Sequence, residues 1–287
     1  MDGYVVPQLA KKNIQYDMIQ KHTDLPSFPY SRSRLLYIFL NKHSTSSTDK
    51  ISELYTLVTS LIQIGMDTHD LVDVGEEQIE MKKMRTRQLR VLAGDYFSSK
   101  FYHLLSQAGQ IDTIHSLSHA ISEVNRLKIN LYMKMKKFKL SAEDYFQHCI
   151  DIKSQLYLIF TNYMDEMLQK QWPDILVSIT KCELITEEID KMNQIQIKDL
   201  RGSWAYWYIL KQATSEEKEM LKKDSCNKSL IQSVLLKYNI KVKLHQMLEN
   251  QWKDVSEKVN NIKNENIKNE LEKIGQPFIS YLSASKV

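Results

Sequence analysis

Glycine and proline are scarce in this chain, and their spacing constrains its fold more than any other feature of the sequence. Only 7 glycines and 5 prolines occur among 287 residues, with no proline between Pro29 and Pro173 and no glycine between Gly109 and Gly202. Because these two residues interrupt or weaken helices, long unbroken helices are expected. No stretch of strand length alternates apolar and polar residues between turn signals. The sequence therefore predicts an all-α fold.

Apolar residues recur at helical spacing along most of the chain, which places the expected helices. Capping residues predict where two of them begin: Ser47 or Thr48 in a loop at 44–50, and Ser141 with Asp144 further along. The expected helices lie at 8–22, from 31, from the loop at 44–50 into an acidic stretch at 67–73, at 91–107, from 112, at 142–170 and at 173–192, where Pro173 fits the first turn.

Three regions differ in texture. Residues 1–30 hold three of the five prolines and are expected to form an N-terminal arm. Residues 31–192 carry the strongest helical periodicity and are expected to form the main helical bundle. Residues 193–287 include a second capping pair, Thr214 with Glu217, and are expected to complete or extend that bundle with further helices.

Composition excludes several classes of function. The 39 basic and 35 acidic residues give a net charge of only +4, which does not suggest a nucleic-acid binder. Apolar runs such as that at 35–40 are far shorter than the roughly 20 residues of a membrane span, so membrane contact is expected to be peripheral at most. Three widely spaced cysteines, Cys149, Cys182 and Cys226, form no paired motif. Together with the absence of a signal-peptide pattern, this predicts a cytoplasmic protein.

The acidic stretch contains the residues with the clearest potential for a site. On a helix, Asp67 and Asp70 share one face, as do Asp70 and Asp73, and carboxylates so spaced can ligate one hard cation. His69 lies among them. No two aspartates are adjacent anywhere in the chain. The alternative is a solvated helix end beside a structural histidine, and the residues alone leave both interpretations open.

A basic cluster follows, and its residues allow three roles. Arg85, Arg87 and Arg90 stand close together with two lysines just before them. Such a run forms a solvated helix face, a diphosphate clamp or a patch for an acidic partner surface. The next helix carries large apolar side chains at 96, 97, 101, 102 and 105, which can serve the core or a partner interface.

Three segments together resemble a known family. They are DTHD at 67–70, RQLRVLAGDYFSSKFYHLLS at 87–106 and ISEVNRLKINLY at 121–132. In this combination and spacing they are similar to component 1 of bacterial heptaprenyl diphosphate synthase, densely over 50–145 and more loosely towards the end of the chain. The resemblance implies the all-α bundle of the trans-prenyl synthase, or terpenoid synthase, fold.

The family implies a non-catalytic subunit of a two-component enzyme. Its partner, component 2, would carry two DDxxD motifs, bind Mg²⁺, and condense farnesyl diphosphate with isopentenyl diphosphate towards the menaquinone side chain. This chain would bind no cofactor itself and would help form the product tunnel that sets chain length. The implied tunnel or partner-interface residues are Tyr96, Phe97, Phe101, Tyr102 and Leu105, with Arg85, Arg87 and Arg90 facing an acidic rim.

The chain departs from the catalytic members of the fold at the metal motif. Where they have HDDxxD, this sequence reads His69, Asp70, Leu71, Val72, Asp73, Val74, so that the second and third carboxylate positions are apolar. Loss of two metal-ligating carboxylates removes charge neutralisation from the leaving diphosphate, and no autonomous condensation is expected. The alternatives are an autonomous Mg²⁺-dependent prenyltransferase or terpene cyclase with a divergent motif at 67–73, and a helical scaffold unrelated to isoprenoids.

Overall fold

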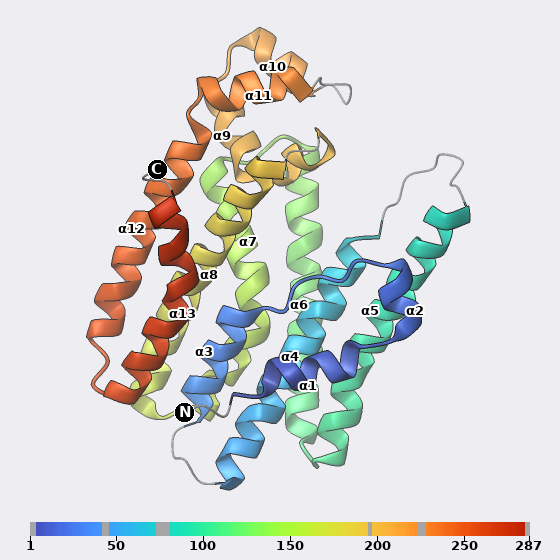
Figure 1. Cartoon of the computed structure of the whole chain (residues 1–287), viewed down its shortest axis with the longest axis vertical. Helices are drawn as coiled ribbons and strands as arrows, with labels where there is room; N and C mark the ends of the chain where they lie inside the picture. Colours follow the sequence, from blue (N-terminus) through green and yellow to red (C-terminus); the bar gives the residue numbers. More distant parts are fainter. Residues whose placement is uncertain (1–3, 42–45, 73–80, 195–196, 223–227, 285–287) are drawn as a thin grey trace. The chain divides into compact units, whose positions relative to one another are not determined.

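Long helices make up most of the chain, as the spacing of its glycines and prolines predicts (Figure 1). The computed structural model describes residues 4–41, 46–72, 81–194, 197–222 and 228–284, and these ranges contain no strand. The predicted all-α class is thereby confirmed. Among the described residues, no helix is both long enough and apolar enough to cross a membrane.

The chain divides into two compact units, each made of two segments. Unit 1 consists of Met1–Ile121 and Leu156–Lys170, and unit 2 of Ser122–Gln155 and Gln171–Val287. All three boundaries between the units fall inside helices, so α6, α7 and α8 each contribute residues to both units. The sequence-based division at residues 30 and 192 stays a prediction.

Unit 1 contains the N-terminal helices. They are α1 (Val6–Ile14), α2 (Asp17–His22), α3 (Tyr30–Leu40), α4 (Ser46–Asp70), α5 (Met81–Gln107), the first part of α6 (Ile111–Lys136) and the short 3-10 helix η1 (Ile159–Tyr163). Unit 2 contains the remaining elements. They are the rest of α6, most of α7 (Ala142–Leu158) and α8 (Glu166–Gln194), then η2 (Ile197–Gly202), α9 (Trp204–Gln212), α10 (Ser215–Lys222), α11 (Lys228–Lys237), α12 (Ile240–Asn260) and α13 (Glu265–Ala284).

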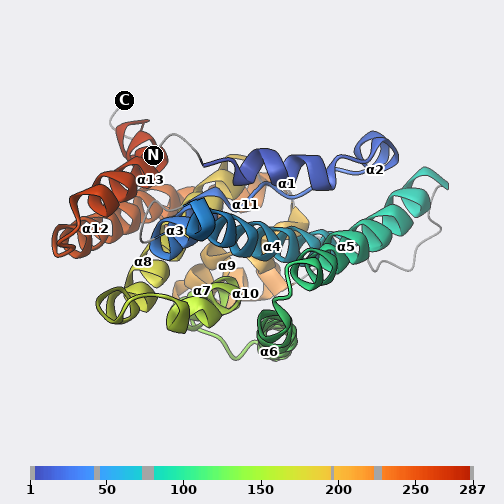
Figure 2. The same ribbon diagram turned by 90° about the horizontal axis from the view of Figure 1, so that it is seen from below.

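Helix α4 forms the centre of unit 1. Every residue from 55 to 66 is buried, because α1, α3 and α5 all pack against this helix (Figure 2). Val6 and Ala10 of α1 pack on Leu57 and Leu61, so the predicted N-terminal arm is part of the core. A helix that is buried all round has no solvated face, which is why its middle carries few charged residues.

Several predicted helix boundaries were wrong, each at a point where tertiary contacts act. The expected helix at 8–22 is two helices, because the backbone at Gln15 and Tyr16 is extended. The expected helix at 142–170 ends at Leu158, where η1 buries Phe160 with its ring centroid 5.4 Å from that of Tyr55. Helix α8 therefore starts at Glu166, and Pro173 lies inside it rather than in its first turn.

Two other starts also differ from the prediction. Helix α4 begins at Ser46, before the expected caps at Ser47 and Thr48, and α5 begins at Met81 instead of residue 91. Within the charged helical stretch that precedes residue 91, Thr86 donates a hydrogen bond to the His22 carbonyl of α2 (3.1 Å). Local charge density therefore did not mark a helix boundary here.

The predicted capping pairs are confirmed in unit 2. The Asp144 N–H donates to the Ser141 hydroxyl at 3.0 Å, and the Ser141 N–H donates back to the Asp144 carboxylate at 3.3 Å. Thr214 and Glu217 make the same reciprocal pair at the start of α10. Each pair satisfies backbone donors that a helix start leaves without a partner.

Candidate functional site

Two glycines let α4 and α5 approach closely in unit 1. A Cβ added to Gly65 of α4 would lie 3.0 Å from both the Gly94 carbonyl oxygen and the Ser98 nitrogen of α5. Side chains normally hold helix axes further apart than this contact allows. The glycine of the Gly94-Asp95-Tyr96 triplet therefore lies where the two helices are in backbone contact.

The imidazole of His69 covers Gly94. A Cβ added to Gly94 would lie 2.6 Å from His69 Nε2, so any larger residue would displace the ring. In this position Nε2 is 3.2 Å from the Asp95 carboxylate, and both side chains are more than a third exposed. The histidine of the acidic stretch and the aspartate of the triplet are thus brought together, and the glycine between them makes room for the contact.

Asp67 belongs to a different, more buried network. Its carboxylate accepts a hydrogen bond from the Gln63 amide at 2.8 Å, and the Gln63 carbonyl accepts one from Arg32 of α3 at 3.2 Å. The Arg32 guanidinium lies 5.1 Å from the ring centroid of Tyr157. Because Arg32 and Gln63 are almost fully buried, this chain of contacts fixes Asp67 from within the unit.

The end of α4 is held by the basic cluster. Arg90 donates a hydrogen bond to the Leu71 carbonyl at 2.8 Å, where a cation favourably meets the helix C-terminus. Asp70 is exposed, and Asp73 lies outside the described residues. Arg85 is exposed and Arg87 half-buried, and no ion pair of either is found within the described part of the chain.

The large side chains of α5 divide between core and surface. Phe97 packs with Ile19 and Ile64, and Phe101 and Leu105 are equally buried. Tyr96 is half-buried. Tyr102 is 49% exposed, and its hydroxyl lies 3.1 Å from that of Ser118 on α6. A role of these residues in a tunnel or partner interface stays a prediction.

No metal-binding cluster is found among the described residues of the acidic stretch. Asp67 faces Gln63 and His69 faces Asp95, so the two groups are committed to different neighbours. Within the described ranges, no three histidine, cysteine, aspartate or glutamate side chains come together as a metal would require. The described donors can position one another, but they do not form a cation cage.

A second carboxylate cluster, in unit 2, was missed by sequence reasoning. Glu187 and Glu188 of α8 pair with Lys153 at 2.5 Å and with Lys191 at 2.8 Å, beside a cavity of about 130 Å³. Burial raises the pKa of the Glu188 carboxyl. The sequence signal was the Glu-Glu dipeptide followed by a lysine three residues on, a spacing that brings side chains together on a helix.

Glu188 also caps α9. Its carboxylate accepts the backbone N–H of Trp204, the first residue of that helix, at 2.8 Å. Lys191 and Tyr145 donate to the Gly202 carbonyl just before it, at 3.2 Å and 2.6 Å. The cluster therefore connects α7, α8 and the start of α9, and its two carboxylates pair with two lysine ammonium groups.

The fold is that of the prenyl diphosphate synthases. Geranylgeranyl pyrophosphate synthase from Lactobacillus brevis aligns with a TM-score of 0.73 at 12% identity, over 96% of this chain and 94% of that one. Decaprenyl diphosphate synthase from Rhodobacter capsulatus aligns with a TM-score of 0.69 at 11% identity, over 97% and 95%. Octaprenyl pyrophosphate synthase from Helicobacter pylori gives 0.66 at 17%, over 96% and 97%. At such identities the likeness shows the fold alone.

Within this fold the family is narrower. Residues 16–196 match the model of heptaprenyl diphosphate synthase (HEPPP synthase) subunit 1, and the chain belongs to that family. Heptaprenyl diphosphate synthase component 1 of Geobacillus stearothermophilus is 34% identical over 128 residues, which are 44% of this chain and 53% of the relative. The match thus spans about half the length of that relative. The family predicted from the sequence segments is confirmed.

Proposed function

We propose that this chain is the non-catalytic subunit of a heterodimeric heptaprenyl diphosphate synthase in the cytoplasm. Its partner would hold Mg²⁺ and both substrates, farnesyl and isopentenyl diphosphate, and would make the bonds of the menaquinone side-chain precursor. This chain would complete the tunnel that receives the growing product. One observation carries the proposal. In a chain with the prenyl synthase fold, Asp67 accepts a hydrogen bond from Gln63 and His69 contacts Asp95, both within unit 1.

The proposed partner surface is an exposed stripe along α5. Met81, Met84, Val91, Leu92 and Tyr102 share one side of this helix at helical spacing, and each is more than a third exposed. Leu92, at 63% exposure, lies near the middle. Exposed apolar side chains that line up in this way favour a protein interface over solvent.

The tunnel role falls to the opposite side of the same helix. Phe97, Phe101 and Leu105 are buried, so in the proposal they support the tunnel wall, while the half-buried Tyr96 extends towards the edge of the tunnel. In the proposal, the exposed Arg85 and the half-buried Arg87 are available to an acidic rim of the partner. Arg90 contributes indirectly by holding the end of α4.

The central experiment separates the two subunits. Farnesyl and labelled isopentenyl diphosphates are incubated with Mg²⁺ and this chain, the catalytic partner, or both. We expect heptaprenyl diphosphate only from the mixture. Product from this chain alone would support an autonomous prenyltransferase instead, and identical products with and without this chain would overturn the subunit role.

The partner surface is tested by a charge placed in its middle. Leu92→Asp should weaken association with the catalytic subunit by at least tenfold, because an unpaired carboxylate would be buried in the interface. Leu236→Asp is a matched control, since Leu236 of α11 is also highly exposed but lies outside the stripe. Equal affinities of the two variants, measured by calorimetry, would remove the stripe from the interface.

The tunnel role is tested by side-chain volume. Phe101→Ala should lengthen or broaden the product distribution of the two-subunit enzyme, although the cavity would also lower stability by about 3–5 kcal/mol. Leu117→Ala, which truncates a fully buried side chain of α6, controls for loss of stability alone. An unchanged distribution with Phe101→Ala, or the same change with both variants, would count against Phe101 as part of the wall.

A further inference from the structure

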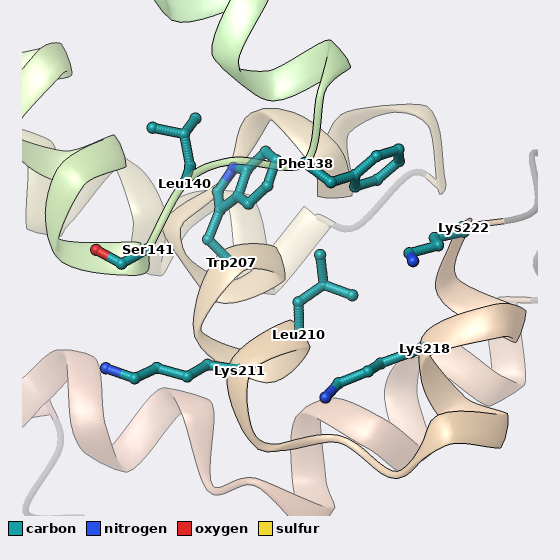
Figure 3. Close-up of a pocket in the computed structure, with 8 residues that line it drawn as sticks. All are labelled: Phe138, Leu140, Ser141, Trp207, Leu210, Lys211, Lys218 and Lys222. Atoms are coloured by element: carbon teal, nitrogen blue, oxygen red, sulfur yellow. The ribbon is translucent and has the colours of Figure 1, made fainter.

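A pocket in unit 2 combines an apolar floor with a basic rim. It measures about 330 Å³ and lies between the α6–α7 connection, α9 and α10 (Figure 3). The side chains of Phe138, Trp207 and Leu210 form the floor, those of Lys218 and Lys222 reach its edge, and that of Lys211 extends to the opposite side of Trp207. Apolar walls with a few convergent polar groups are typical of small-molecule sites, and this volume suits a small ligand.

Phe138 adopts an unusual backbone conformation at this site. It follows α6 with a φ of +51°, a region that favours glycine. The N–H of Phe138 bonds to the Met135 carbonyl at 3.0 Å and that of Lys139 to the Lys134 carbonyl at 3.1 Å, which is the usual glycine-containing helix ending. A strained backbone that holds a large aromatic ring is a feature of functional sites.

The ring of Phe138 is kept beside the pocket and not in the core. It is 42% exposed, with its centroid 6.4 Å from that of the buried Trp207. The Trp207 indole N–H is buried and has no hydrogen-bond partner among the described residues. The floor thus offers an accessible aromatic face, that of Phe138.

The lysines of the rim leave positive charge unbalanced. The Lys222 ammonium lies 5.2 Å from the Phe138 ring centroid, and Figure 3 shows the Lys218 ammonium on the Leu210 side of the pocket. Neither lysine pairs with a carboxylate in the ranges that the structure describes. Lys211 makes only a 3.8 Å contact with Glu143, and both of these side chains are mostly exposed. Like charges gathered in this way favour an anionic ligand.

We infer that this pocket binds a small amphiphilic phosphate. Its short apolar chain would lie on Phe138, Trp207 and Leu210, and its phosphate or diphosphate would lie between Lys218 and Lys222. The apolar floor argues against a free inorganic ion, and the basic rim argues against a neutral lipid. The inference rests on unit 2 alone, so it stands or falls separately from the proposed function.

The first experiment measures which part of the ligand is recognised. The full-length chain is titrated by calorimetry with geranyl diphosphate, with inorganic diphosphate and with geraniol, and octyl phosphate serves as an amphiphile that is not a prenyl compound. We expect one saturable site for geranyl diphosphate, at least tenfold tighter than for either half, and weaker saturable binding of octyl phosphate. Equal binding of inorganic diphosphate, or no saturable binding of either amphiphile, would overturn the inference.

The second experiment places the ligand in the pocket. The double variant Lys218→Gln with Lys222→Gln should weaken geranyl diphosphate binding at least tenfold. Phe138→Gly should weaken it too, while leaving the melting temperature unchanged or higher, because glycine relieves the backbone at this position. The double variant Lys241→Gln with Lys253→Gln is the charge-matched control, since these two exposed lysines of α12 do not line the pocket. Wild-type affinity in both pocket variants would place the ligand elsewhere and overturn the assignment.

Discussion

The acidic end of α4 in unit 1 and the paired glutamates of α8 in unit 2 both present carboxylates on a long helix, but the groups that face them differ. Asp67 accepts from a neutral amide, and Asp95 lies beside His69 with 69% of its side chain exposed. Glu187 and Glu188 instead face lysines, and the Glu188 side chain is only 4% exposed. The Asp95 carboxylate is mostly exposed to solvent, whereas the Glu188 carboxylate is buried and paired with an ammonium group.

The two clusters are stabilised in different ways, one mainly by charge and the other mainly by the shape of the packed side chains. Charge should matter most at Glu188, because a buried ion that loses its partner cannot be rescued by water. Shape should matter most near Asp95, because the His69 ring lies directly on Gly94 and solvent screens the charges. Variants that change charge without shape, or shape without charge, can therefore break or sharpen this contrast.

The largest effect is expected from Glu188→Ala. The variant leaves the buried Trp204 N–H without an acceptor and Lys191 without its carboxylate, so the free energy of unfolding should fall by roughly 2–4 kcal/mol. Glu187→Ala is the matched control, and its exposed ion pair predicts a loss below about 1 kcal/mol. Equal losses in urea denaturation would contradict the difference between the two adjacent glutamates.

Gly94→Ala tests shape in unit 1. The added methyl group must displace the His69 ring, which should cost about 1–3 kcal/mol. In a His69→Ala background the contact with the ring is gone, and the same substitution should stabilise the protein by about 0.5–1 kcal/mol because alanine favours a helix.

Urea denaturation of the wild type, the two single variants and the double variant would show whether the effect of Gly94→Ala on the free energy of unfolding changes sign. Gly202→Ala is a useful control, since a Cβ there meets no atom within 4 Å. If Gly94→Ala changed the free energy of unfolding equally in both backgrounds, the position of the His69 ring would not require a glycine at residue 94.

How much of this contrast the sequence could predict depends on how far apart in the chain the residues of each contact lie. The spacing of glycines and prolines predicted the helices, and the segments at 67–70 and 87–106 predicted the family. Capping pairs such as Ser141 with Asp144 were predictable because both partners lie within one turn. Features encoded within about four residues were therefore accessible.

Contacts between distant residues were not accessible in the same way. Glu187 pairs with Lys153, 34 residues away, and Glu188 caps a helix start 16 residues away. Phe101 and Tyr102 are adjacent, yet one is buried and the other 49% exposed, because only the packing of α5 on α4 fixes which side faces inward. Periodicity gives a helix its apolar side but not the register of its neighbour.

The pH dependence of unfolding tests the buried charge of unit 2 with a smaller effect. Burial raises the pKa of Glu188 above its ordinary value of 4.5, so its contribution to stability is present below that pH and is lost as pH rises through the folded-state pKa. Glu188→Gln lacks this titration. The wild type should therefore lose stability relative to Glu188→Gln as pH rises, by at most about 1.4 kcal/mol per pH unit. Parallel curves in urea denaturation would contradict a raised pKa.

The smallest effect is expected from Asp95→Asn, the charge change in unit 1 that preserves shape. Asparagine keeps an oxygen facing His69, and because the pair is largely exposed, stability should change by less than about 0.5 kcal/mol in urea denaturation. Product formation by the two-subunit enzyme should also stay within twofold, since the proposal gives Asp95 no part in ionising a substrate. A loss as large as that of Glu188→Ala would mean that the contact between Asp95 and His69 depends on charge, and a selective loss of product formation would give Asp95 a part in the chemistry.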